Sequence, residues 1–121
     1  MRQGRIIHGG AVWVEKAERA ESFADRLRGL LGRPSLGSGA ALLIERCGSI
    51  HTVGMRFAID TVFLDRAWRV VRLRRDVRPG RLMVWGGWRA ARVLESETGG
   101  LDLSGIRVGD ELAWEEENAQ R

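Results

Sequence analysis

Residues Cys47–Asp65, C-G-S-I-H-T-V-G-M-R-F-A-I-D-T-V-F-L-D, form the stretch on which the predicted fold depends. Its second half, Ile59–Leu64, is apolar on both faces of an extended chain apart from Asp60 and Thr61. Such a run is typical of a central strand that is covered on both sides. The first half is a turn that carries Cys47 and His51, so polar side chains gather where the chain enters this strand.

Short β-prone runs lie on both sides of this stretch. Arg5–His8 and Ala11–Glu15 flank Gly9-Gly10, a pattern that predicts a hairpin with a two-residue turn. Further strands are expected at residues 41–44, 69–77, 90–96 and 111–115, with glycines in the connections. Because alternating βαβ units are absent, the pattern predicts a mainly β fold, a small antiparallel β-sandwich or barrel.

One helix is predicted to begin at Ser22. Ser22 and Asp25 have the spacing of a capping box, and Phe23, Leu27, Leu30 and Leu31 would then form one apolar stripe. Gly32 and Pro34 suit the end of such a helix. A helix of about ten residues is not stable alone in water, so we expect it to dock this stripe on the sheet.

Length and composition indicate one soluble domain. The 121 residues fit a single domain (residues 1–121) with a family-like core at about 11–115 and a polar tail at 116–121. No stretch has the roughly 20 consecutive apolar residues of a membrane span. The N-terminus resembles no signal peptide, and the single cysteine cannot form an internal disulfide. We therefore expect a cytoplasmic location.

Charge is unevenly distributed along the chain. The net charge is +4, but residues 66–92 contain nine arginines and one acidic residue, whereas residues 93–121 contain two arginines and eight acidic residues. The segment Arg69–Arg81 could bind the phosphates of a nucleic acid. The alternative, which we favour, is that these arginines solvate one face of a strand or neutralise the acidic C-terminal quarter.

Four motifs in this order resemble the domain-of-unknown-function family 192 (DUF 192, also the uncharacterised protein family UPF 0127). They are G-L-L-G-R at Gly29–Arg33, I-H-T-V-G-M-R-F-A-I-D-T-V-F-L-D at Ile50–Asp65, V-L-E at Val93–Glu95 and G-I-R-V-G-D-E-L at Gly105–Leu112. The resemblance implies a β-sandwich of jelly-roll character with a packed helix, and it implies no activity. Members of this family often have proline where this chain has Ala58, and many have export signals.

Cys47 and His51 are the candidates for nucleophilic chemistry. A thiolate beside a histidine could act as a nucleophile, with Asp60 orienting the ring. The two residues would span roughly 13 Å on an extended chain, and only a tight turn through Gly48-Ser49 would bring them together. A structural cysteine is the commoner case, so we expect no catalytic set.

Metal binding would need Cys47 and His51 with Met55 or Asp60. Zinc sites normally have paired ligands such as C-x-x-C, and methionine with cysteine and histidine would suit copper. This chain has no paired ligands, and Met55 fits core packing. No metal and no cofactor are expected.

Asp60 and Glu95 are acidic residues inside apolar strands, so each must be hydrogen-bonded or ion-paired. Each is either a structural anchor or a polar group at the mouth of a cleft that binds a small polar ligand. Trp85 and Trp88 flank Gly86-Gly87 and would either cap the end of the sandwich or bind a ligand. The ligand-binding candidates are His51, Thr52, Met55, Arg56, Asp60, Trp85, Trp88 and Glu95.

These observations favour a non-catalytic binding or accessory module whose partner is a small polar ligand or another protein. The first alternative is a small thiol-dependent enzyme that uses Cys47 and His51. The second is an electrostatic nucleic-acid binder that uses Arg69–Arg81.

Overall fold

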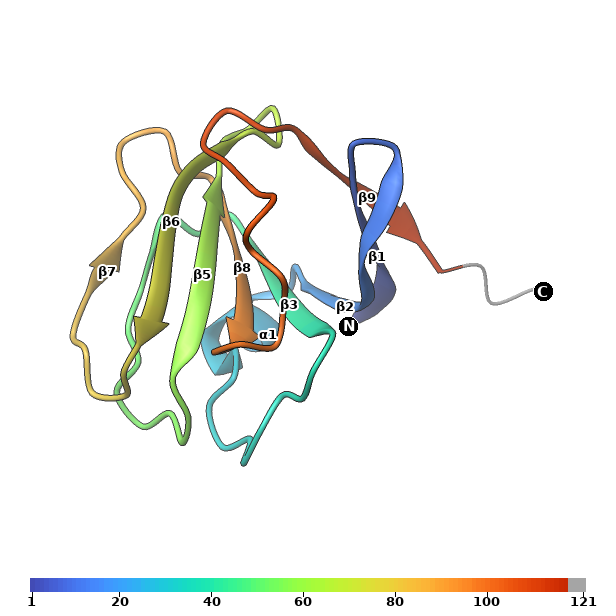
Figure 1. The fold of residues 1–121 in the computed structure, drawn as a ribbon. Coiled ribbons are helices and arrows are strands. Elements are labelled where there is room, and N and C mark those ends of the chain that lie inside the picture. The colour runs from blue at the N-terminus through green and yellow to red at the C-terminus, as the bar shows by residue number, and fades with distance from the viewer. Residues whose placement is uncertain (118–121) are drawn as a thin grey trace.

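The computed structural model describes residues 1–117 and is mainly β, as predicted (Figure 1). It contains one helix, α1 (Phe23–Arg28). Nine strands make up the rest of the regular structure: β1 (Arg2–His8), β2 (Ala11–Ala20), β3 (Ala40–Glu45), β4 (Ser49–Ile50), β5 (Ile59–Leu64), β6 (Val70–Val77), β7 (Val84–Trp85), β8 (Arg92–Glu97) and β9 (Leu112–Glu116).

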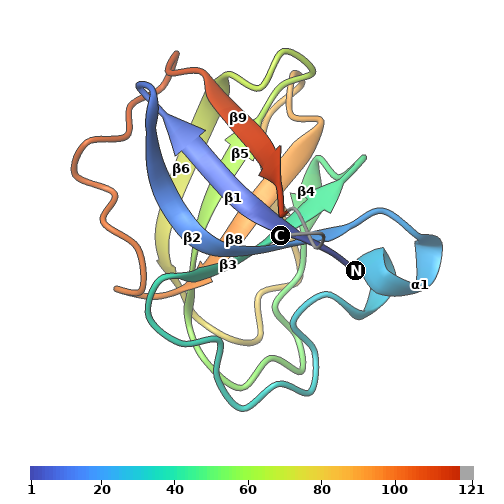
Figure 2. The ribbon, with the colours of Figure 1, turned by 90° about the vertical axis from the view of Figure 1, so that its right-hand side faces the viewer.

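Seven strands form one sheet in the order β6-β5-β8-β3-β2-β1-β9, and β4 pairs with β7 in a second, two-stranded sheet. All neighbours in the large sheet are antiparallel except β2 and β3, which are parallel. Parallel neighbours need a crossover connection, and here the segment containing α1 provides it (Figure 2). The large sheet is therefore mixed, whereas the sequence led us to expect antiparallel pairing throughout.

The hairpin at Gly9-Gly10 is confirmed. His8 pairs with Ala11, and the two glycines have φ values of 59° and 79°. Positive φ at both central residues is the requirement of the type I′ turn, and its twist matches that of the flanking strands. An isolated bridge between Arg69 and Glu111 joins the starts of β6 and β9, the two edge strands, although the sheet does not close into a barrel.

Each face of the large sheet has its own apolar cluster, because successive side chains of a strand point to opposite faces. In β8, Val93 belongs to one cluster and Leu94 to the other. The first cluster also receives the segment between β8 and β9 through Leu101, Leu103 and Ile106. The second cluster lies between the sheet and the residues that follow α1, together with those around β4 and β7. This second cluster surrounds the candidate site.

The helix begins as predicted but does not dock its apolar stripe. The Ser22 hydroxyl accepts a hydrogen bond from the Asp25 amide at 3.1 Å, which is the expected cap. Gly29 has a φ of 50°, so the helix ends at Arg28, before Leu30 and Leu31. These two leucines leave the helical phase and pack in the second cluster, while Phe23 and Leu27 are 75% and 67% exposed. No residue of α1 itself is buried, so the predicted stripe packs on the sheet only through Leu30 and Leu31, which follow the helix.

Within residues 1–117, no helix is long and apolar enough to cross a membrane.

Candidate functional site

A cavity of about 150 Å³ lies on the second face of the sheet, beneath the residues that end and follow α1. We call it the Glu95 cavity, because this glutamate is its one acidic residue. The turn that leads toward β5 contributes residues from Cys47 to Met55. Its complete lining is Arg26, Leu27, Arg28, Gly29, Leu30, Leu31, Ile44, Cys47, Ser49, Ile50, His51, Met55 and Glu95.

Glu95 lies in the middle of the large sheet, on the side of the second cluster. It pairs with Leu42 of β3 and Thr61 of β5, and it follows Val93 at the two-residue spacing that keeps both side chains on one face. The residue is 3% exposed. No residue among those described donates a hydrogen bond to its carboxyl group or forms an ion pair with it.

Burial without a partner changes the protonation of Glu95. Removing water disfavours the charged carboxylate, because no nearby cation or donor replaces the lost hydration. Burial therefore raises the pKa of Glu95 to about 7. At neutral pH this carboxyl group is divided between its neutral and its charged form. It can donate a hydrogen bond in the first form and accept one in both.

Cys47 lies at the entrance of the same cavity. Arg46 has a φ of 49° and turns the chain at the end of β3, after which the Cys47 amide bonds to the Ala91 carbonyl at 2.9 Å. The thiol donates to the Ser49 carbonyl at 3.1 Å. Burial and then the charge of Glu95 raise the pKa of Cys47, although the Ser49 contact and Arg26 oppose them. A nucleophilic cysteine needs a lowered pKa, so this environment is the reverse of an activated thiol.

Arg26 extends from α1 to the cavity and has an unsatisfied donor. One of its terminal nitrogens donates to the Arg46 carbonyl at 3.1 Å. Its Nε–H is buried and has no acceptor among residues 1–117. Leaving such a donor unpaired is costly, and native structures contain few of them. Because this nitrogen has no accessible surface, protein atoms cover it and it does not face the cavity.

His51 and Met55 are the other predicted candidates in this lining. His51 is exposed, whereas Met55 is buried in the second cluster. The turn that holds them is fixed by Thr52, which is fully buried. Its hydroxyl donates to the Arg78 carbonyl at 2.7 Å and accepts from the Arg81 amide at 2.9 Å. Thr52 therefore fixes the turn without lining the cavity. Arg56 is exposed and does not line the cavity either.

Asp60 is held away from the cavity by backbone donors. Its carboxylate accepts from the Asp76 amide at 2.8 Å and from the Gly99 amide at 3.2 Å. These bonds tie β5 to the end of β6 and to the turn after β8, which is the role of a structural anchor. Asp60 and Glu95 are thus both buried acids in neighbouring strands, but only Asp60 has partners.

Trp85 and Trp88 form a separate surface. Their rings meet edge to face with centroids 5.1 Å apart, and Trp88 is 93% exposed. Trp88 borders an open hollow of about 960 Å³, which we call the Trp88 groove. Its lining is Glu45, Arg46, Cys47, Gly48, Asp65, Arg66, Ala67, Trp88, Arg89, Ala90, Ala91 and Arg92. Cys47 lines both this groove and the Glu95 cavity, so the two hollows adjoin.

The arginines of Arg69–Arg81 do not gather on one face. Arg72 lies over the Trp85 ring and donates to the Trp85 carbonyl, on the side of the second cluster. Arg75 donates to the carbonyl of Leu103, a residue of the first cluster on the opposite side. Arg69 reaches toward Glu111 at 3.8 Å. The segment therefore provides separate cations at the edge of the sheet and no continuous basic stripe.

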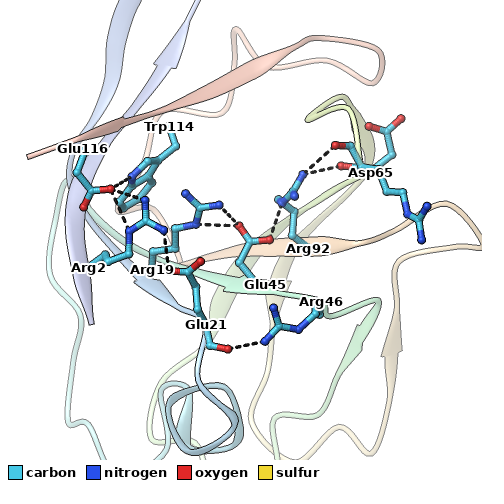
Figure 3. A network of polar contacts seen from close by, with 10 residues as sticks. Arg2, Arg19, Glu21, Glu45, Arg46, Asp65, Arg92, Trp114 and Glu116 are labelled. Atoms are coloured by element: carbon cyan, nitrogen blue, oxygen red, sulfur yellow. Dashed lines mark hydrogen bonds and ion pairs between the residues drawn. The ribbon is translucent and has the colours of Figure 1, made fainter.

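A buried ion-pair network borders the Trp88 groove (Figure 3). Glu45 at the end of β3 is 5% exposed and accepts from Arg19 and from Arg92, each at 2.9 Å. Both guanidinium groups also lie against the Trp68 ring, at 5.4 and 4.3 Å from its centroid. Figure 3 shows Glu45 between the two arginines, with Arg92 continuing to the Asp65 carbonyl. The negative charge of Glu45 is thus paired with two guanidinium groups, whereas Glu95 has no ion-pair partner among the described residues.

Sequence reasoning missed two of the functional groups described here. Arg26 was not among the predicted site residues, and its position over the cavity follows from the early end of α1 at Gly29. Glu45 stands before Arg46 at the end of an apolar run and was not among the predicted site residues. The sequence did contain a signal for Glu45, because it directly follows an apolar strand, where a buried carboxylate needs partners.

Among the described residues, no three of the His, Cys, Asp and Glu side chains are placed to hold a metal ion.

Comparison with known proteins places these features in a family. The family model DUF192, described as "Uncharacterized ACR", matches residues 5–114. A UPF0127 protein of Thermococcus sibiricus is 34% identical over 112 residues, a match that covers 89% of this chain and 71% of the relative.

Two solved structures share the fold. One is a protein of unknown function from Novosphingobium aromaticivorans, with a TM-score of 0.78 and 20% identity, covering 93% of this chain and 84% of the other. The second, from Sinorhizobium meliloti, is described as a proposed transcription regulator, with a TM-score of 0.77 and 18% identity, covering 93% and 92%. At these identities the likeness extends to the fold alone.

Proposed function

This chain belongs to the DUF192 family of uncharacterised proteins, and we propose that it is a non-catalytic binding module that holds a small ligand in the Glu95 cavity. The observation that carries the proposal is the buried carboxyl group of Glu95, which lines a cavity and has no partner among residues 1–117. A buried polar group without a partner is costly for stability, and a ligand that supplies the partner would recover that cost on binding.

Size and lining restrict what this cavity can hold. An apolar cavity of about 150 Å³ in another protein accommodates benzene, so a ligand with a similar number of non-hydrogen atoms would fit. Leu30, Ile44 and Met55 would contact the apolar body of such a ligand. Glu95 would bind its polar end. Sites of this kind, mainly apolar with a few placed polar groups, are typical of small-molecule binding.

We propose a non-catalytic role because Cys47, His51 and Asp60 are not arranged as a catalytic set. The pKa of Cys47 is raised by burial, and its thiol donates to a backbone carbonyl. Asp60, which could have oriented His51, is bound to backbone amides instead. These contacts argue against the thiol-dependent alternative.

The test is a set of two-dimensional amide NMR spectra of labelled protein, titrated with small uncharged, cationic and anionic compounds. We expect shifts to cluster at residues around Cys47–Met55, Glu95 and the end of α1. The matched control for the polar anchor is Glu15→Gln, which changes an exposed carboxylate on β2, against Glu95→Gln in the cavity. A panel that leaves the cavity residues unshifted, or shifts only residues elsewhere, would overturn the proposal.

A second candidate function, binding of single-stranded nucleic acid, is favoured by a different observation. The exposed Trp88 lines the Trp88 groove together with Arg66 and Arg89, and neither arginine is ion-paired among the described residues. Aromatic rings that stack on bases and arginines that contact phosphates are the parts such a surface needs. Quenching of tryptophan fluorescence by an oligonucleotide, lost as salt rises and lost in Trp88→Ala, would support it. Absence of quenching at low salt would refute it.

A further inference from the structure

Four exposed apolar side chains gather on residues 81–89, a segment that we call the β7 arm. Trp88 and Leu82 are the two most exposed large apolar residues of the described chain, at 93% and 85%, and Met83 and Trp85 are exposed beside them. Figure 1 shows β7 at the outer side of β6, on the side of the molecule opposite β1 and β9. A group of large apolar side chains in water marks an interaction surface more often than chance.

The backbone of the β7 arm is fixed so that these side chains face outward. Val84 is buried, and because side chains alternate along an extended chain, Met83 and Trp85 on either side of it point away from the protein. β7 is paired with β4, and before it the Thr52 amide donates to the Arg81 carbonyl at 2.9 Å. The arm cannot turn its apolar side chains inward without breaking these bonds.

Two glycines return Trp88 to the side of Trp85. The Gly86 backbone lies directly against the Phe63 ring, leaving no room for a side chain. Gly87 follows with a φ of 99°, a conformation that glycine adopts readily. The turn therefore places the Trp88 ring edge to face against Trp85 at the surface, and not over the core.

Arginines without acidic partners flank the β7 arm. Arg81 begins the arm and Arg89 ends it, while the guanidinium carbon of Arg72 in β6 lies 6.0 Å from the centroid of the Trp85 ring. Arg72 and Arg89 line a hollow of about 420 Å³ with the two tryptophans, and no acidic residue lines it. None of the three arginines is ion-paired within residues 1–117. Residues 77–94 contain no acidic side chain.

This combination matches the surface of a membrane that contains anionic lipids. Tryptophan prefers the boundary between head groups and acyl chains, because its ring is apolar and its N–H is polar. Each arginine close to an anionic bilayer strengthens binding by about 1 kcal/mol, or roughly fivefold. Apolar side chains that protrude between such arginines would add the burial of apolar surface to this attraction.

We propose that the β7 arm docks the protein on the surface of an anionic lipid bilayer. Leu82, Met83 and Trp88 enter the head-group region, and the three flanking arginines contact lipid phosphates. The protein lies on the bilayer and does not span it. The β7 arm shares no residue with the lining of the Glu95 cavity, so this inference is independent of the proposed function.

The size and composition of the arm favour a bilayer over the other possible partners. A stable protein interface takes roughly 20–30 residues from each side and needs a matching shape, whereas single protruding side chains can enter a bilayer. A nucleic acid would stack on Trp88 and contact the arginines, but it offers no apolar surface to Leu82 and Met83.

Co-sedimentation with lipid vesicles is the direct test. One set of vesicles contains phosphatidylglycerol and phosphatidylcholine in equal amounts, and the control set contains phosphatidylcholine alone. We expect binding to the anionic vesicles to be at least about tenfold tighter, with a blue shift of tryptophan fluorescence as Trp88 leaves water. No sedimentation with anionic vesicles at low salt, or equal binding to both sets, would overturn the proposal.

Substitutions of exposed residues separate the apolar from the electrostatic contribution. Leu82→Ser combined with Met83→Ser should weaken binding to anionic vesicles by about tenfold or more, because less apolar surface is buried. Arg81→Gln combined with Arg89→Gln should weaken it by about twentyfold. Val108→Ser is the matched control, since Val108 is 65% exposed in the segment between β8 and β9, and it should bind normally. Urea denaturation checks that each variant is folded. Unchanged binding by the Leu82–Met83 variant, or an equal loss in Val108→Ser, would refute the insertion of the arm.

Two other outcomes would assign the β7 arm to a different partner and overturn the proposal. The first is an oligonucleotide that binds the unmodified protein and the Leu82–Met83 variant equally, while neither binds vesicles. The second is dimerisation in sedimentation velocity that this variant abolishes, again without vesicle binding, which would make the arm a contact between two copies of the chain.

Discussion

Replacing Glu95 by glutamine should make the protein progressively more stable, relative to the unmodified protein, as the pH rises. The carboxyl group is buried in the second cluster, and burial raises its pKa from 4.5 to about 7. An acid with a higher pKa in the folded than in the unfolded state favours folding when it is protonated. Its favourable effect is therefore fully present below pH 4.5 and is lost as the pH rises to 7.

The size of the effect follows from the two pKa values. Each pKa unit corresponds to about 1.4 kcal/mol, so moving from 4.5 to about 7 costs the folded state roughly 3 kcal/mol at pH 8. Glutamine has a similar shape and no charge, and it removes this pH-dependent cost. Burying its amide adds a penalty that does not change with pH. The diagnostic quantity is thus the change with pH in the stability difference between the variant and the unmodified protein.

Urea denaturation followed by tryptophan fluorescence measures this quantity at a series of pH values. The chain has five tryptophans, and other titrating groups cancel when the two proteins are compared at the same pH. We expect the difference to grow in favour of Glu95→Gln by about 3 kcal/mol between about pH 4.5 and pH 8. Glu15→Gln, at an exposed position, should show no such trend. A difference for Glu95→Gln that stays constant across this range would refute the reasoning.

Three further predictions concern the surroundings of the site. Glu45→Gln should lower the free energy of unfolding by about 3–5 kcal/mol, because it leaves Arg19 and Arg92 buried without their shared carboxylate; an unchanged melting temperature would contradict this. Cys47 should react slowly with iodoacetamide at neutral pH, and Glu95→Gln should accelerate the reaction by removing a nearby negative charge; rapid alkylation of the unmodified protein would count against a buried, protonated thiol. Gly86→Ala should destabilise the fold by about 1–3 kcal/mol, since its new methyl group would overlap the Phe63 ring. Thermal denaturation of this single variant, compared with the unmodified protein, tests the prediction.

Much of the fold could be predicted because it depends on local pattern. A run that is apolar on both faces identified the strand Ile59–Leu64, and Gly9-Gly10 identified the hairpin turn. The parallel pairing of β2 with β3 could not be predicted, because it depends on where a crossover returns to the sheet and not on the residues of either strand. The helix cap at Ser22 was predictable, but the end of the helix at Gly29 was not distinguished from one at Gly32.

The candidate site was predicted in part. Glu95 and Asp60 are equivalent in the sequence, each an acid inside an apolar strand. They differ only through long-range contacts, which give Asp60 two backbone donors and give Glu95 none among the described residues. Cys47, His51 and Met55 were candidates whose proximity the sequence left open, and all three line one cavity. Arg26 was missed because its position over that cavity follows from the early end of α1.

The protonation of Glu95 is the most direct test of this account. Carbon-13 NMR of the side-chain carboxyl group reports it as the pH is varied. We predict a pKa of about 7 for this carboxyl group. A pKa near the ordinary value of 4.5 would show that Glu95 is solvated or paired and would contradict the account.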